Sequence, residues 1–204
     1  MKKIVIIGAG SFNFTRAIAR DIFTFPALAD SRIVLVDLPE GEKYMAASHK
    51  IIQKTIDQGG YAATVESTFD RRAALADADC VIITLRNDLT IESWAKDLEI
   101  PKKYGVDVTV GDTRGPSGIF RFMRSAPVFK SIAEDILELC PNALVLNYTN
   151  PMCMCTGYMR KLGIEVIGLC HSVQGTSSML AKWIGADMKD VTFKCFGVNH
   201  QVFF

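Results

Sequence analysis

Short apolar runs alternate with longer amphipathic segments along the chain. The runs predict strands buried on both faces, and they cover Lys3–Ile7, Arg32–Val36, Cys80–Leu85, Leu144–Tyr148 and Glu165–Leu169. The segments between them place apolar residues three and four positions apart, which predicts helices over Thr15–Phe23, Glu40–Gln58, Thr90–Tyr104, Phe120–Leu139, Met152–Leu162 and Thr176–Ile184. This alternation indicates an α/β fold with a doubly wound, mostly parallel, Rossmann-like sheet.

Composition and charge narrow the class of protein. Hydrophobic residues make up 49% of the 204 positions and charged residues 22%, which is typical of a globular chain and excludes disorder. A net charge of +1 without a basic run argues against nucleic acid and anionic membrane as partners. The apolar runs are far shorter than the ~20 residues of a membrane-spanning helix. Six cysteines without paired zinc spacing indicate mostly reduced core thiols.

The N-terminus briefly imitates a secretory signal. Two lysines precede an apolar run, but Gly8 and Gly10 interrupt it and Asn13 and Arg16 follow at once. We therefore expect the run to be a first strand and the protein to be cytoplasmic.

The turn after this strand resembles a dinucleotide-binding fingerprint. Gly8 permits the tight turn, Gly10 lets backbone N–H groups approach a pyrophosphate, and Asn13 stands where the third glycine would be. Alone, this pattern also fits an ordinary glycine-rich turn. Asp37 at the end of the second strand favours NAD over NADP, because its carboxylate binds ribose hydroxyls and repels a 2′-phosphate. The candidate cofactor-binding residues are Gly8, Gly10, Ser11, Phe12, Asn13, Asp37 and Asn147.

Chemically reactive side chains follow the later strands. Ligands of such sheets bind beyond the carboxyl ends of the strands, where Cys170 and, further along the chain, His200 lie. A thiolate and an imidazole could share a divalent metal. Their spacing is no metal motif, however, and an inert buried thiol and a hydrogen-bonded structural histidine are the more usual roles of such residues.

A series of motifs identifies a family. Together they resemble glycoside hydrolase family 4, the NAD- and manganese-dependent glycosidases, over essentially the whole chain and most closely its α-galactosidase (melibiase) branch. The motifs, in order, are Gly8-Ala9-Gly10-Ser11, Glu99-Ile100-Pro101-Lys102-Lys103-Tyr104-Gly105, Gly111-Asp112-Thr113-Arg114-Gly115-Pro116, Asn147-Tyr148-Thr149-Asn150-Pro151-Met152, Gly168-Leu169-Cys170-His171-Ser172-Val173-Gln174-Gly175 and Gly197-Val198-Asn199-His200.

The resemblance implies a redox-assisted elimination. In that family NAD takes a hydride from C3 of the sugar, a base removes the acidified C2 proton, and the glycosidic oxygen leaves from C1. Water then adds, and the retained NADH reduces the ketone. Mn²⁺ acts as the Lewis acid that stabilises the enediolate charge.

The same resemblance assigns roles to individual residues. Cys170 and His200 match the metal ligands, Asn150 matches the asparagine that holds the sugar hydroxyls, and Asp112 would be the acid to the leaving oxygen. His171 would contact substrate or orient the metal site. An Asx turn at Asn150 and a loop-capping carboxylate at Asp112 are the structural alternatives.

The chain departs from the family pattern in places. Ser117 replaces an expected glycine, which would stiffen that loop. Arg114 and Arg121 could meet sugar or cofactor, although an ion pair or a solvated position is the simpler interpretation. The Cys170-His171-Ser172 sequence points to an unphosphorylated sugar, with α-galacturonides, α-glucuronides and α-glucosides left open beside α-galactosides.

The chain ends on apolar residues at Phe204, after a strand-like piece at Val191–Phe196. We expect residues 1–196 to form the NAD-binding domain and residues 197–204 to begin a truncated substrate and oligomerisation domain. Family members are about twice as long, and the resemblance implies that the missing part supplies the base, much of the sugar pocket and the homo-oligomer interface. This chain would then not turn over alone. The competing hypotheses are a lactate/malate-type dehydrogenase and an inactive NAD-binding fragment.

Overall fold

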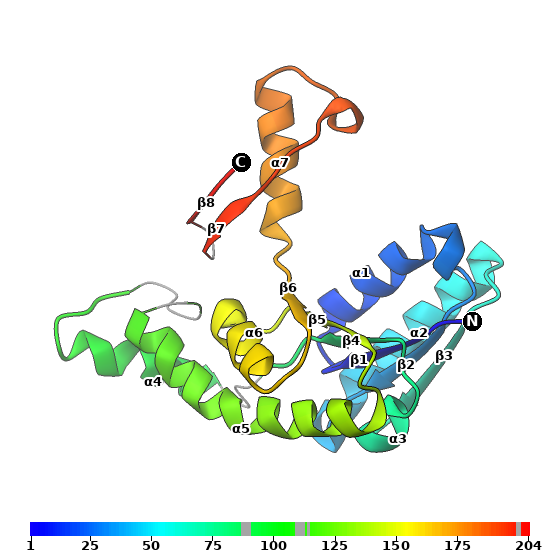
Figure 1. The fold of residues 1–204 in the computed structure, drawn as a ribbon, viewed down its shortest axis with the longest axis horizontal. Coiled ribbons are helices and arrows are strands. Elements are labelled where there is room, and N and C mark those ends of the chain that lie inside the picture. The colour runs from blue at the N-terminus through cyan, green and yellow to red at the C-terminus, as the bar shows by residue number, and fades with distance from the viewer. Residues whose placement is uncertain (87–90, 109–112, 114, 199–200) are drawn as a thin grey trace.

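A parallel sheet lies at the centre of the molecule (Figure 1). A computed structural model describes residues 1–86, 91–108, 113, 115–198 and 201–204 of the chain. In this sheet, as far as the residues are described, the strand order is β3-β2-β1-β4-β5-β6, and its pairings are all parallel. The strands are β1 (Lys3–Ile7), β2 (Arg32–Val36), β3 (Thr64–Thr68), β4 (Cys80–Ile83), β5 (Leu144–Asn147) and β6 (Val166–Gly168). This arrangement confirms the doubly wound, Rossmann-like sheet.

Helices cover both faces of the sheet. The side chains of β1 alternate between two buried clusters, Ile4 and Ile6 in one and Val5 and Ile7 in the other. The first cluster packs against α1 (Phe12–Phe23) and α2 (Glu42–Gly59), and the second against α3 (Arg71–Leu75), α5 (Gly115–Leu139) and α6 (Met152–Lys161). Helix α4 (Ile91–Lys102) packs on α5. No helix of the described residues is long and apolar enough to cross a membrane.

Several helices and strands begin or end at residues other than those expected. Helix α5 begins at Gly115 rather than at Phe120, so Ser117 is a buried helical residue and the expected stiffening of a loop at this position is wrong. The five expected strands are all present, with slightly earlier ends for β4, β5 and β6. The short elements β3 and α3 were not expected, because neither has a strong apolar pattern. In β3, Val65 is the one buried residue.

The C-terminal arm stands away from the sheet (Figure 1). It consists of α7 (Ser172–Trp183) and an antiparallel hairpin of β7 (Phe196–Val198) and β8 (Gln201–Phe203). The expected strand at Val191–Phe196 is wrong, because only Phe196 lies in a strand. The apolar residues of the preceding stretch have no partner strand in the described part of the chain. A second domain starting at residue 197 stays a prediction.

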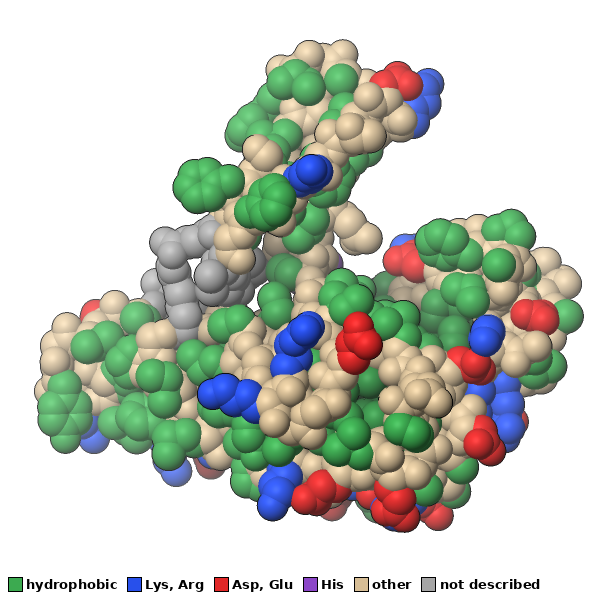
Figure 2. All heavy atoms as spheres, viewed as in Figure 1, with side chains coloured by type: hydrophobic (Ala, Val, Ile, Leu, Met, Phe, Trp, Pro, Cys, Tyr) green, Lys and Arg blue, Asp and Glu red, His purple; other side chains and the backbone are tan. Residues whose placement is uncertain are grey.

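Apolar side chains gather on the surface of this arm (Figure 2). The exposed ones are Met179, Trp183, Ile184, Phe193, Phe196, Phe203 and Phe204.

Candidate functional site

Steric contacts fix the conformation of the turn after β1. Gly8 has φ +88°, in the left-handed region that favours glycine. A Cβ on Gly8 would lie 2.8 Å from the carbonyl carbon and oxygen of Thr84, which follows the neighbouring strand β4. The Gly8 and Ala9 N–H groups donate to the Val36 carbonyl at 2.9 and 3.1 Å, so the turn is tied to both strands that flank β1.

Buried hydroxyls satisfy the carbonyls of the turn. Thr84 Oγ1 donates to the Gly8 oxygen at 3.0 Å. Thr15 Oγ1 and Ser48 Oγ donate to the Ala9 oxygen at 2.9 and 3.2 Å, from α1 and α2 respectively. All three hydroxyl-bearing residues are buried. The turn is therefore held in one conformation by the protein itself, which is the preorganisation that a binding loop requires.

Asp37 lies against this turn, as its position after β2 led us to expect. The Gly10 N–H donates to Oδ2 of the carboxylate, and the Leu38 N–H donates to Oδ1 at 2.7 Å. Each carboxylate oxygen keeps further acceptor capacity. Asp37 is half-buried and can still accept hydrogen bonds from a ligand at the sheet edge.

The other turn residues begin helix α1. Ser11 precedes the helix and Phe12 is its first residue. Asn13 is exposed, and its Oδ1 accepts a hydrogen bond from Arg16 Nη2 at 3.1 Å. The Arg16 guanidinium also lies over the Phe12 ring, 5.1 Å from its centroid. Sequence reasoning did not assign Arg16, although its place one turn into a helix that follows a glycine-rich loop puts a cation where an anion would bind.

A pocket of about 220 Å³ opens where the ends of β1, β4 and β5 meet. This is the point at which the strand order reverses, and ligands of doubly wound sheets bind there. The described residues that line this pocket include two arginines and no acidic side chain. They are Ser11, Phe14, Thr84, Leu85, Arg86, Arg121, Tyr148, Thr149 and Asn150.

The two asparagines at the end of β5 and in the loop after it differ in their surroundings. Asn147 is fully buried, donates to the Thr149 oxygen and to Thr156 Oγ1 at 3.2 Å each, and accepts from the Thr149 N–H at 3.0 Å. It shapes the loop after β5, and its contact with a cofactor stays a prediction. Asn150 lines the pocket, while its Oδ1 accepts from the Met152 N–H at 3.3 Å in an Asx turn.

Cys170 and His171 follow β6 at the same edge. Cys170 is half-buried and His171 is exposed. Burial raises the pKa of the neighbouring Tyr148 hydroxyl, and the negative charges of Asp21 and Cys170 raise that pKa further. The ring of Phe14 lies 5.7 Å from the ring of Tyr148 and 5.8 Å from that of His171. Phe14, which sequence reasoning did not assign, thus connects the start of α1 to the residues after β5 and β6.

Part of the expected constellation lies outside the described residues. Asp112, Arg114 and His200 belong to it, so the acid and the second metal ligand stay predictions. Within the residues that the structure describes, no three His, Cys, Asp or Glu side chains group as a metal site.

Three other cysteines have thiols whose pKa is raised. Burial raises the pKa of the Cys80 thiol to about 11 and that of Cys155 to about 12. It also raises the pKa of Cys140. These thiols remain protonated at neutral pH, and the thiolate is the metal-binding form. They fit the expected role of reduced core thiols.

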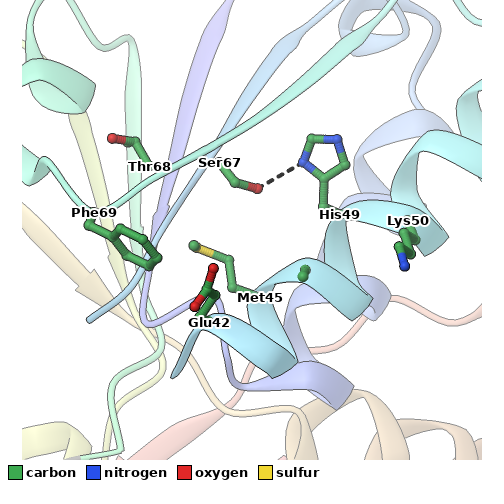
Figure 3. A pocket seen from close by; sticks show the side chains of 8 residues that line it. Glu42, Met45, His49, Lys50, Ser67, Thr68 and Phe69 are labelled. Carbon is green, nitrogen blue, oxygen red and sulfur yellow. Dashed lines mark hydrogen bonds between the residues drawn. The ribbon is translucent and has the colours of Figure 1, made fainter. Parts of the chain in front are cut away.

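A second, larger pocket of about 500 Å³ lies between α2 and the end of β3 (Figure 3). His49 Nδ1 and Ser67 Oγ are 2.8 Å apart across it, and Met45 and Phe69 supply apolar surface. It shares no lining residue with the pocket at the strand reversal.

Comparison with known proteins decides the family. The profile of the family described as "Family 4 glycosyl hydrolase" matches residues 3–186. The chain belongs to this family. An α-galactosidase from Rhizobium meliloti (strain 1021) is 39% identical over 204 residues, which are 99% of this chain and 41% of that relative. A protein of Bacillus subtilis (strain 168), named "Probable 6-phospho-beta-glucosidase", is 38% identical over 98% of this chain and 45% of its own length.

The fold comparison agrees. The structure of a 6-phospho-beta glucosidase from Thermotoga maritima with manganese, NAD⁺ and glucose-6-phosphate superposes with a TM-score of 0.84 at 21% identity, covering 99% of this chain and 48% of that one. The two proteins thus share the Rossmann-like fold over this chain. The chain spans less than half the length of the curated relatives it matches.

Proposed function

We propose that this chain carries the NAD-binding and metal-binding part of a glycosidase that acts on unphosphorylated α-galactosides. The observation that carries the proposal is the pocket at the strand reversal, which brings the glycine-rich turn together with the residues after β4 and β5. Cys170 follows β6 at the same edge of the sheet. Cofactor and sugar groups would therefore meet at one place, as hydride transfer between them requires.

The turn fits a dinucleotide. Its backbone is already held by Thr84, Thr15 and Ser48, so ordering it for the pyrophosphate costs little. Asp37 would accept the ribose hydroxyls and repel a 2′-phosphate. Arg16 at the start of α1 would add positive charge beside the phosphates. NAD is accordingly the proposed cofactor.

Cys170 and His200 would hold the metal. A half-buried thiol after a parallel strand is accessible enough to bind a cation, which would deprotonate it. When bound, Mn²⁺ would supply Lewis-acid chemistry at the sugar oxygens, and NAD⁺ would accept and return the hydride.

The remaining residues would position the sugar. Asn150 would hold its hydroxyls from the pocket wall, and His171, beside Phe14, would contact the substrate or orient the metal ligands. Asp112 is the proposed acid to the leaving oxygen. These groups act by holding the sugar and by moving one proton at its glycosidic oxygen.

A second substrate class has one observation in its favour. Arg86 and Arg121 both line the pocket, and guanidinium groups bind carboxylates in a bidentate manner. An α-galacturonide, which carries a carboxylate at C6, would use them more fully than a neutral galactoside does. The cofactor phosphates compete for the same arginines, so we place the α-galactoside first.

Binding experiments separate these substrates. Methyl α-galactoside and methyl α-galacturonide are titrated calorimetrically into the chain loaded with NAD and Mn²⁺. Tighter binding of the galactoside is expected, and tighter binding of the galacturonide would transfer the proposal to the acidic sugar.

A turnover assay tests whether this chain alone is sufficient for catalysis. With nitrophenyl α-galactoside, NAD, Mn²⁺ and a reductant, we expect no nitrophenol release from the chain alone, and release would show that it is sufficient. Net NADH production from lactate or malate would instead support a dehydrogenase. Binding of NAD without metal or sugar would leave an inactive cofactor-binding fragment.

Location and assembly are also proposals. We propose a cytoplasmic location for the protein. The exposed apolar side chains of the C-terminal arm support burial against further protein, as in a homo-oligomer of the full-length enzyme.

A further inference from the structure

Two glycines enclose the carboxylate of Asp37. A Cβ on Gly10 would lie 2.7 Å from Asp37 Oδ2, and a Cβ on Gly41 would lie 2.6 Å from Oδ1 and 2.7 Å from Cγ. Gly41 ends the short 3-10 helix Pro39–Gly41 and precedes α2. The two glycines are themselves close, because a Cβ on Gly10 would also lie 3.4 Å from the Gly41 oxygen.

The backbone does not require glycine at position 41. Its φ of −88° and ψ of −2° lie in the right-handed region, which any residue adopts. Glycine is therefore required at this position because a side chain has no space there. The predicted clash involves Cγ as well as an oxygen, so bending the end of the side chain does not relieve it and the whole carboxylate must rotate away.

We propose that Gly41 is a specificity-determining residue for the cofactor, because the absence of a side chain there lets Asp37 stand where it selects NAD against NADP. This inference rests on the proposed function. Gly41 would act through Asp37, as a positioning residue. A methyl group at position 41 would displace the carboxylate from the Gly10 and Leu38 N–H groups and from the ribose hydroxyls it would accept.

The consequence differs between the two cofactors. Displacing the carboxylate removes charged hydrogen bonds to the NAD ribose, and each such bond contributes enough to change affinity about tenfold or more. The same displacement relieves the repulsion of the NADP 2′-phosphate. Gly41→Ala should therefore weaken NAD at least about tenfold while leaving NADP affinity unchanged or higher.

The test is a double-mutant cycle read by calorimetric titration with NAD and with NADP. The variants are Gly41→Ala, Asp37→Ala and the two combined. With Asp37 removed, the added methyl group has nothing to displace, so Gly41→Ala should change neither affinity in that background. Gly157→Ala in α6 is the matched control, because a Cβ there meets nothing within 4 Å.

The outcomes separate the inference from the proposed function. If the wild-type chain binds no NAD, the proposed function fails. If it binds NAD and Gly41→Ala keeps the full preference for NAD, the inference alone fails. An equal loss from Gly41→Ala with and without Asp37 would also overturn it, since the effect would then be structural. If Gly41→Ala unfolds while the double variant stays folded and binds like Asp37→Ala, the steric coupling is supported.

Discussion

At the scale of single residues, the glycine-rich turn is shaped by contacts rather than by flexibility. Gly8 is needed both for its backbone conformation and for its approach to Thr84, whereas Gly10 and Gly41 leave room for one carboxylate. The fingerprint singled out Gly8, Gly10 and Asp37 as cofactor-binding residues; Gly10 and Asp37 are in contact, and their role in cofactor binding stays a prediction. It could not predict Gly41, because a steric requirement across two loops leaves no local pattern.

Replacing Gly8 by Ala should destabilise the fold strongly. Alanine would have to adopt a left-handed backbone conformation, and its Cβ would lie 2.8 Å from main-chain atoms of Thr84. Together these two effects should lower the free energy of unfolding by about 3 kcal/mol. Gly60→Ala is the matched control, because Gly60 has φ +63° and no atom within 4 Å of a Cβ. It should lose only about 1 kcal/mol. Urea denaturation measures both, and equal losses would show that Thr84 imposes no constraint.

Replacing Cys170 by Ser should remove Mn²⁺ affinity and spare NAD binding. A hydroxyl stays protonated where the thiol becomes a thiolate, so the variant loses an anionic ligand. Manganese electron paramagnetic resonance measures free ion in the presence of protein. Cys195→Ser, another half-buried cysteine, serves as the control. Full metal affinity in the Cys170 variant would contradict the assignment.

At the scale of elements, the continuous apolar runs gave correct strands because both faces of β1 and β2 are buried. Strand β3 has polar residues on its exposed face, and its position depends on pairing with β2, including the ion pair between Arg32 and Glu66 at 2.8 Å. The local periodicity of the sequence does not reveal this pairing between strands. The stretch before the C-terminal hairpin illustrates the opposite error, since the strand-like residues 191–195 gained no partner strand among the described residues and only Phe196 lies in β7.

Helices α4 and α5 are joined by a buried carboxylate. Asp97 is 2% exposed, and both of its oxygens accept from Arg124, with Nη1 to Oδ1 at 2.6 Å. Asp97→Ala should destabilise the protein by about 2–3 kcal/mol, because it leaves the guanidinium without its main partner in a partly buried position. Glu134→Ala breaks an exposed pair with Lys130 and should cost less than about 0.5 kcal/mol. Chemical denaturation distinguishes the two, and equal effects would contradict a structural role for the buried pair.

At the scale of the whole molecule, the sheet and the C-terminal arm are separate in packing. Both core clusters are built from residues up to Val166, and no residue of α7 or of the hairpin belongs to either. The arm instead carries exposed aromatic side chains such as Trp183 and Phe203. The sheet domain therefore has its own core.

A chain shortened to residues 1–171 should keep its fold and its NAD affinity. Its loss in Tm relative to the full chain should be small, because the two core clusters remain complete. Circular dichroism during heating and titration with NAD provide the measurement. Loss of a cooperative transition would show that the arm is part of the folding unit.

The central claim is that one strand edge binds both NAD and a divalent metal. Calorimetric titration of the 204-residue chain with NAD, followed by Mn²⁺ in the same cell, tests it most directly. We predict saturable binding of NAD and then of Mn²⁺. Absence of NAD binding, or NAD binding with no subsequent uptake of metal, would contradict the account.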